Sequence, residues 1–107
     1  MTDMEKLEFQ FKAASATPAA GTALCGVVGS GNLEILIRPG EPADTCQVHI
    51  RTSARGFGRI WEAVIAEFAA RHPVGGTRID INDMGATPAV VSLRLSQALG
   101  DYTGGAQ

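Results

Sequence analysis

The feature that most constrains the fold is an alternation of apolar and polar side chains in short segments separated by glycine and proline. Residues 7–13 are the clearest case, with Leu7, Phe9 and Phe11 apolar and polar residues between them. A period of two puts alternate side chains on opposite faces of a strand, so the segment predicts a strand with one buried face. The same alternation predicts strands over residues 33–38, 46–51 and 78–82, and the continuously apolar segment 23–28 predicts a more central strand.

The period changes to that of a helix after the fourth predicted strand. From Phe57 to Phe68 the apolar residues recur at i, i+3, i+4, i+7, i+8 and i+11, which is typical of an amphipathic helix. We expect Ser53 or a nearby glycine to start this helix. His72-Pro73 should stop it, because the residue before proline resists helical angles.

A second helix is expected after the last predicted strand. Thr87 is a suitable N-cap, and Pro88 suits the first helical position. Gly100 offers a C-terminal cap, so residues 101–107 are expected to fray. The apolar stripe of this helix consists of Val91, Leu95, Ala98 and Leu99.

The predicted elements follow the order β-β-β-β-α-β-α along 107 residues. This length suits one domain, residues 1–107, with a core that needs no metal or disulfide. One-sided strands favour antiparallel pairing, with one face solvated and the other covered. We therefore expect an α+β fold: a two-layer sandwich of a mostly antiparallel five-stranded sheet with two helices packed on one face. The pattern does not determine the strand order.

Composition excludes several function classes. Nine Lys and Arg residues against eleven Asp and Glu leave a net charge of −2, too little positive charge for a nucleic-acid-binding face. No apolar run approaches the ~18 residues of a membrane span, and the N-terminus lacks the pattern of a signal peptide. Two cysteines are too few for a secreted disulfide scaffold. We expect a cytoplasmic protein that binds neither nucleic acid nor membrane.

The histidines and cysteines do not form a recognisable site. His49 belongs to a polar strand face and His72 to a helix end, and nothing in the pattern brings them together. Solvated histidines are the favoured interpretation over a catalytic or metal pair, and no metal site is predicted. Cys25 and Cys46 lie in apolar strand patterns, so we expect small buried side chains rather than a redox pair.

The acidic and arginine residues allow two interpretations: an ordinary structural or solvated role, or a binding or catalytic site. Asp80 and Asp83 are of the type that binds metal or works as an acid/base pair. We favour Asp80 on a wet strand face and Asp83 tying down the turn that follows it. Arg51, Arg55 and Arg59 form a loose basic group running into the first helix, which is either a solvated surface or an anion site.

The glycine-rich segment 26–31 is the remaining candidate. Its glycine spacing is wrong for a dinucleotide-binding motif, and a strand rather than a helix follows it. Ser30 stands between Gly29 and Gly31 at a predicted hairpin tip, where glycines ordinarily serve the turn. The same geometry would expose the serine hydroxyl to an external transferase. The pattern shows no neighbouring base, which argues against a self-activated nucleophile.

Four segments, taken in order, extend over nearly the whole chain and resemble a known family. They are Met4–Phe9, Gly26–Glu34, Ile81–Pro88 and Val91–Leu95, and they include Gly-Ser-Gly at 29–31 and Asp-x-Gly-Ala-Thr-Pro at 83–88. The family is the acyl carrier (δ) subunit of bacterial malonate decarboxylase. Asn32 and Ala89 depart from its pattern, in which Asp and Gly are usual.

The resemblance implies a covalent cofactor on Ser30: 2′-(5″-phosphoribosyl)-3′-dephospho-coenzyme A, joined through a phosphodiester by a dedicated prosthetic-group transferase. Its thiol would hold acetyl and malonyl thioesters for transfer and decarboxylation by partner subunits. The chain would then be a non-catalytic acyl carrier domain. Gly29 and Gly31 would let a partner's wall approach the attachment site closely.

Other readings stay open. The acyl carrier (γ chain) of citrate lyase uses the same kind of arm. A phosphopantetheine carrier fits less well, because such carriers are acidic helical bundles with the serine at a helix start. An unmodified protein-interaction module and a small α/β enzyme are the alternatives from other classes.

Overall fold

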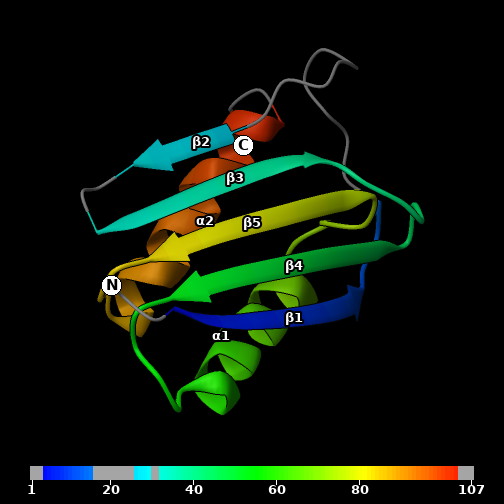
Figure 1. The fold of residues 1–107 in the computed structure, drawn as a ribbon. Coiled ribbons are helices and arrows are strands. Elements are labelled where there is room, and N and C mark those ends of the chain that lie inside the picture. Colours follow the sequence, from blue (N-terminus) through cyan, green and yellow to red (C-terminus); the bar gives the residue numbers. More distant parts are fainter. Residues whose placement is uncertain (1–3, 16–25, 30–31, 104–107) are drawn as a thin grey trace.

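The structure, a computed structural model, describes residues 4–15, 26–29 and 32–103 (Figure 1). Its elements follow the predicted order. They are β1 (Glu5–Lys12), β2 (Gly26–Gly29), β3 (Leu33–Pro39), β4 (Thr45–Thr52), α1 (Gly58–Arg71), β5 (Thr77–Asp83) and α2 (Pro88–Tyr102). Among the described residues, neither helix is long and apolar enough to cross a membrane.

The five strands form one sheet in the order β1-β4-β5-β3-β2. The β4–β5 pair is parallel, whereas β1–β4, β2–β3 and β3–β5 are antiparallel. The α+β class is thus confirmed. Where a mostly antiparallel sheet was predicted, the sheet is mixed: three of its four strand pairs are antiparallel and one is parallel. The reason is that α1 carries the chain back across the sheet between β4 and β5, and such a crossover makes the two strands run in the same direction.

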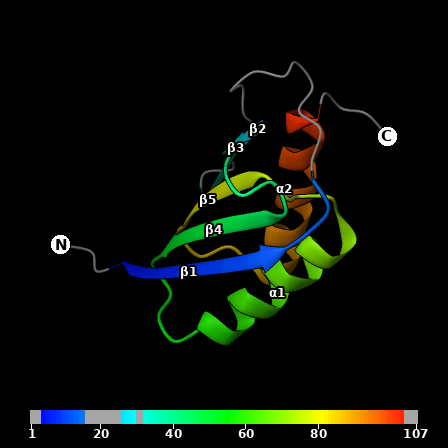
Figure 2. The same ribbon diagram turned by 90° about the vertical axis from the view of Figure 1, so that its right-hand side faces the viewer.

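Both helices cover the same face of the sheet (Figures 1 and 2), as predicted. Alternate residues of the three central strands point toward the helices and are buried with the apolar stripes of α1 and α2. Burial of such side chains from water is the main force that holds the two layers together. The core includes Ile35 and Ile37 of β3, Val48 and Ile50 of β4, Ile79 and Ile81 of β5, Trp61, Ile65 and Phe68 of α1, and Val91, Leu95 and Leu99 of α2.

The helix ends agree only in part with the sequence-based expectation. The first helix, α1, begins at Gly58 with Phe57 as its N-cap residue, so a nearby glycine starts it rather than Ser53. The predicted stop at His72-Pro73 is confirmed, because α1 ends at Arg71. Gly100 does not end α2, because the helix continues to Tyr102. Tyr102 is 3% exposed, so burial of its ring favours the extra turn over the glycine stop. The expected fraying is therefore wrong for Asp101 and Tyr102, which are helical, and residues 104–107 lie outside the described residues. The other predicted helix signals, Thr87 as N-cap and Pro88 in the first turn, are confirmed.

The second strand differs from its prediction in two ways. We predicted a more central strand over residues 23–28 and a turn starting at Gly29, but β2 lies at the edge of the sheet and continues to Gly29, which pairs with Glu34 of β3. Within the described residues, 26–28 are confirmed as strand. A glycine has no side chain to obstruct a ladder, and pairing with β3 extends the strand to it. Cys25, Ser30 and Gly31 lie outside the described residues.

Candidate functional site

The strand ends on either side of Ser30 in the sequence, at Gly29 and Leu33, lie at one end of the sheet. Gly29 ends β2 and Leu33 begins β3, and Leu33 pairs with Asp83, the last residue of β5. Asp83 in turn pairs with Thr52 at the end of β4. We call this the hairpin edge: residues 29, 32–33, 52–57 and 83–87, at the left of Figure 1. The predicted hairpin is supported by its two arms, which are adjacent and antiparallel.

Asp83 organises the hairpin edge. Its side chain is 2% exposed, and Oδ2 accepts a hydrogen bond from the Thr52 hydroxyl at 2.8 Å. Oδ1 accepts the backbone N–H groups of Gly85 at 3.2 Å and Ala86 at 2.8 Å. The prediction that Asp83 ties down the turn is confirmed. With three donors on its two oxygens at a buried position, this carboxylate holds the turn and the end of β4 together.

The same turn holds the β2–β3 connection. The backbone N–H of Met84 donates to the carbonyl of Asn32 at 2.8 Å, and the Ser53 N–H donates to the carbonyl of Asp83 at 3.0 Å. The residue before β3 is therefore hydrogen-bonded to the β5–α2 turn. The residue after β4 is hydrogen-bonded to the same turn. A segment connected to several strand ends in this way is a firm root for a flexible attachment.

A hollow of about 260 Å³ opens beside the hairpin edge, between the first turns of α1 and α2. We call it the apolar groove. Its lining consists of Ala54, Phe57, Ile60, Trp61, Val64, Asp83, Gly85, Ala86, Pro88 and Val91. Asp83 is thus shared between the groove and the hydrogen-bond network of the hairpin edge.

The sequence pattern missed the apolar groove. It placed Phe57 and Ile60 on the buried stripe of the first helix, but both are 46% exposed, whereas Trp61 is 6% exposed and Ile65 is buried. Phe57 and Ile60 therefore form a wall of the apolar groove rather than part of the core. The available signal was the start of the apolar stripe before the helix itself begins, at Phe57.

The hairpin edge is uncovered. Met84 is 55% exposed, and a Cβ built on Gly56 or Gly85 would meet nothing within 4 Å. Asn32, two residues beyond Ser30 in the sequence, is exposed. A bulky group attached to the β2–β3 connection would thus find open space at this edge, so the surroundings fit such a group.

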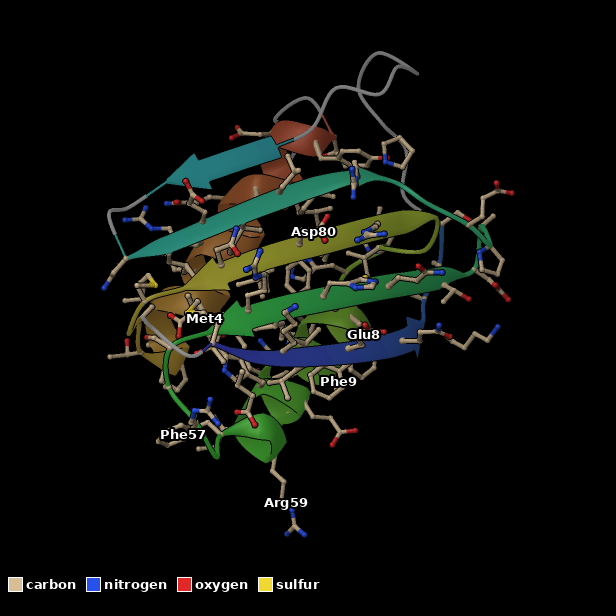
Figure 3. The ribbon with its side chains drawn as sticks, viewed as in Figure 1. Met4, Glu8, Phe9, Phe57, Arg59 and Asp80 are labelled. Atoms are coloured by element: carbon tan, nitrogen blue, oxygen red, sulfur yellow. The ribbon has the colours of Figure 1, made fainter. Side chains whose placement is uncertain are left out.

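The structure divides the predicted basic group. Arg51 lies on the open face of the sheet, because it pairs with Lys6 at an exposed position of β4. Arg59 lies in the first turn of α1, on the helical side, and points into solvent (Figure 3). Arg55 is exposed in the loop between them. Arg55 and Arg59 flank Phe57, a wall of the apolar groove, whereas Arg51 is across the sheet.

The two histidines do not meet, as predicted. His49 lies on the open face, with Nδ1 at 3.9 Å from Glu8 Oε2. His72 follows α1 on the other side of the sheet, and its ring centroid is 4.8 Å from that of Phe68. Within the described residues no group of three or more His, Cys, Asp or Glu side chains is placed to hold a metal ion.

The two aspartates are separated as well. Asp80 lies on the open face of the sheet (Figure 3), where it forms ion pairs with Arg38 and Arg78 at 3.2 Å each. Asp83 points to the opposite, buried side. Asp80 on a wet strand face is thus confirmed, and the structure does not bring the two together as an acid/base pair.

Cys46 is buried, as predicted. The Thr77 hydroxyl donates to its Sγ at 3.4 Å. Burial raises the pKa of the thiol above its ordinary value, and the Thr77 hydrogen bond opposes the change only in part. A thiol that stays protonated is a poor nucleophile, so Cys46 belongs to the core.

Comparison with known proteins points to one family. The family model described as malonate decarboxylase delta subunit matches residues 20–102. The malonate decarboxylase acyl carrier protein of Acinetobacter calcoaceticus is 52% identical over 101 residues, which are 94% of this chain and 99% of that protein. That of Burkholderia cepacia is 59% identical over 97 residues, 91% of this chain and 89% of its own length.

A solved structure shows the same fold. One chain of the crystal structure of a Pseudomonas malonate decarboxylase hetero-tetramer in complex with malonate superposes with a TM-score of 0.75 at 39% sequence identity. The match covers 92% of this chain and 99% of that chain.

Proposed function

The chain belongs to the malonate decarboxylase delta subunit family of acyl carrier proteins, and from this we propose that Ser30 carries its prosthetic group, 2′-(5″-phosphoribosyl)-3′-dephospho-coenzyme A. The observation that carries the proposal is the match to an acyl carrier protein over 94% of the chain at 52% identity. The proposed attachment joins the Ser30 oxygen to the group through a phosphodiester. A separate prosthetic-group transferase makes this bond.

The surroundings of Ser30 in the chain support the attachment. Gly29 and Asn32, the described residues on either side, both lie at the uncovered hairpin edge. Gly29 and Gly31 leave no side chains next to the serine, so a transferase or a partner subunit can approach closely. A serine with such sequence neighbours suits modification by an external enzyme.

When attached, the group would supply a thiol that holds acetyl or malonyl as a thioester for transfer and decarboxylation by partner subunits. The residues of this chain have a different task. The network of Asp83 and Thr52 and the Met84–Asn32 hydrogen bond hold the root of the arm. Tethering replaces bulk encounter with a high effective concentration at each partner's active site.

The carrier is non-catalytic in this account. Asp83 is 2% exposed and holds the turn through its hydrogen bonds, and His49 lies on the opposite face of the sheet from the apolar groove. Transferase and decarboxylase subunits therefore supply the oxyanion and proton donors. The assembled Pseudomonas relative is a hetero-tetramer, which supports a multi-subunit setting. We place the chain, as one carrier domain of residues 1–107, in the cytoplasm.

Intact-mass analysis tests the attachment. The chain is produced with and without the prosthetic-group transferase, as wild type, as Ser30→Ala and as Ser96→Ala, which removes an exposed hydroxyl from α2. We expect the mass of the arm on wild type and Ser96→Ala only when the transferase is present, and never on Ser30→Ala. Arm-sized mass on Ser30→Ala would contradict the proposal.

The alternatives give different results. A citrate lyase carrier would acquire the same arm but would restore citrate cleavage rather than malonate decarboxylation to a carrier-depleted complex. An unmodified interaction module would bind the partner subunits equally well with Ser30 replaced and would acquire no mass.

A further inference from the structure

We propose that the apolar groove binds the acetyl-bearing end of the arm and excludes the malonyl-bearing end. This inference rests on the function proposed above, because it takes the arm at Ser30 as the occupant. It assigns the groove residues a task in the reaction cycle: they hold the uncharged form against the carrier and leave the charged form free for a partner subunit.

The position of the groove favours the arm as its occupant. Asp83 lines the groove, and its neighbour Met84 is hydrogen-bonded to Asn32 at 2.8 Å. Consecutive Cα atoms are ~3.8 Å apart, so residue 30 has its Cα within ~7.6 Å of that of Asn32. A group tethered there meets the groove at an effective concentration on the order of millimolar, which a free ligand or a partner side chain lacks.

The groove is large enough for the end of the arm but too small for the whole arm. Pockets that enclose drug-sized ligands measure roughly 300–1,000 Å³. At about 260 Å³ the groove lies just below that range, so it suits a thioester with a short acyl group and the carbon atoms next to it. The nucleotide part of the arm stays outside.

The lining suits an uncharged end. Phe57, Ile60 and Trp61 present apolar surface, and Asp83 is the ionisable side chain among the described residues that line the groove. The backbone N–H groups of Gly85 and Ala86 are already donated to Asp83, so they are not offered to a second carboxylate.

The two acyl ends therefore differ in their fit. An acetyl end terminates in a methyl group, which gains apolar contact when it is removed from water. A malonyl end terminates in a carboxylate, which would lose hydration and lie beside the carboxylate of Asp83; both effects oppose binding. Replacement of acetyl by malonyl therefore releases the end of the arm from the groove.

Trp61 makes the groove observable, because it is the one tryptophan in the sequence. The full chain is prepared in apo, acetyl-loaded and malonyl-loaded forms, each verified by mass, and quenching of Trp61 fluorescence by acrylamide is measured. Trp61 is 6% exposed, so the quenching constant is already low in the apo form, and we expect it to fall about two-fold further in the acetyl form, because the bound end covers the remaining exposed part of the ring. The malonyl form should match the apo form.

Variants locate the effect. Ile60→Glu puts a charge on a half-exposed groove wall, and Ala86→Leu fills the groove without a charge; each should abolish the acetyl-dependent protection. Leu93→Glu is the matched control, because Leu93 is 54% exposed on α2 and does not line the groove, and it should retain the protection. A nuclear Overhauser contact from a ¹³C-labelled acetyl methyl to the Trp61 ring should appear in wild type and in Leu93→Glu only.

The failures are distinguishable. Equal quenching in verified apo, acetyl and malonyl forms overturns this inference and leaves the proposed function intact. Stronger protection by malonyl than by acetyl overturns it too. Equal quenching combined with loss of complex assembly in Ile60→Glu would assign the groove to a partner subunit instead. Absence of arm mass on the wild-type chain overturns the proposed function, and this inference with it.

Discussion

At the scale of single residues, Asp83 has the largest structural role at the proposed site. Replacing it with alanine leaves the Thr52 hydroxyl and the N–H groups of Gly85 and Ala86 without their acceptor at a buried position. Unpaired buried donors are costly, so we expect Asp83→Ala to lower the free energy of unfolding by about 2–3 kcal/mol. Urea titration measures the change.

The control is Asp101→Ala, which removes an exposed carboxylate from α2 and should change the free energy of unfolding by less than about 0.5 kcal/mol. A similarly small effect of Asp83→Ala would contradict the structural role that we give to this residue.

Cys46 provides a prediction about pH. Burial raises the pKa of its thiol in the folded chain above the ordinary value of 9.0, so above that pH the unfolded chain loses this proton before the folded chain does. The contribution to stability is therefore present below pH 9.0 and declines as the pH rises past it. The stability difference between wild type and Cys46→Ala should shift against wild type between about pH 8 and about pH 10.

The same burial is visible in alkylation. In the native chain at neutral pH we expect peptide mapping to find Cys46 unmodified by iodoacetamide, and in urea to find it modified, because only the unfolded chain exposes the thiol. Rapid native labelling of Cys46, or a pH-independent difference from Cys46→Ala, would show that the thiol is not held in the core.

At the scale of elements, substitutions at two glycines distinguish the effect of close backbone packing, at Gly75, from that of helix propensity, at Gly100. A Cβ on Gly75 would overlap the carbonyl of Ala13 and lie 2.6 Å from that of Ala43, whereas a Cβ on Gly100, inside α2, would meet nothing within 4 Å. Gly75→Ala should cost about 2 kcal/mol or more in unfolding free energy, and Gly100→Ala should add about 0.5–1 kcal/mol. Thermal unfolding of both variants measures this; a stabilised Gly75→Ala would refute the close approach.

Element type was predictable from the sequence because one period dominated each segment. Thr87-Pro88 marked the start of α2 correctly, since capping is local chemistry. Gly100 misled the prediction of the helix end, because the burial of Tyr102 is a tertiary effect that no local pattern contains. The prediction of core residues in the first turn of α1 failed for the same reason. Periodicity marks Phe57 and Ile60 as apolar, but it does not say whether they pack in the core or line a groove.

At the scale of the whole molecule, the parallel β4–β5 pair was the main feature that periodicity did not predict. The strand-helix-strand order around α1 allowed a parallel pair, yet pairing partners depend on the global path of the chain. The candidate site was likewise predictable only in part. The family resemblance selected Ser30, and the turn role of Asp83 was predictable, but the hairpin edge and the apolar groove exist only once β5 lies beside β3.

The exposed arginine at the start of α1 gives a prediction for the assembled complex. Arg59 lies beside the apolar groove and points into solvent (Figure 3), so we propose that it meets phosphates of the arm or an acidic partner surface. Arg59→Glu should reduce malonate turnover by the reconstituted complex roughly five-fold or more at low salt. Arg71→Glu, at the exposed far end of α1, should leave turnover near that of wild type; equal effects of the two variants would reject the role.

The most direct test of the central claim is to locate the added mass on the chain itself. Tandem mass spectrometry of the peptide containing Ser30, taken from chain produced with the transferase, can distinguish this serine from Ser15, Thr17 and Thr22, which precede it in the sequence. We expect every fragment that retains the arm to include Ser30. Arm-bearing fragments that lack Ser30 would contradict the account.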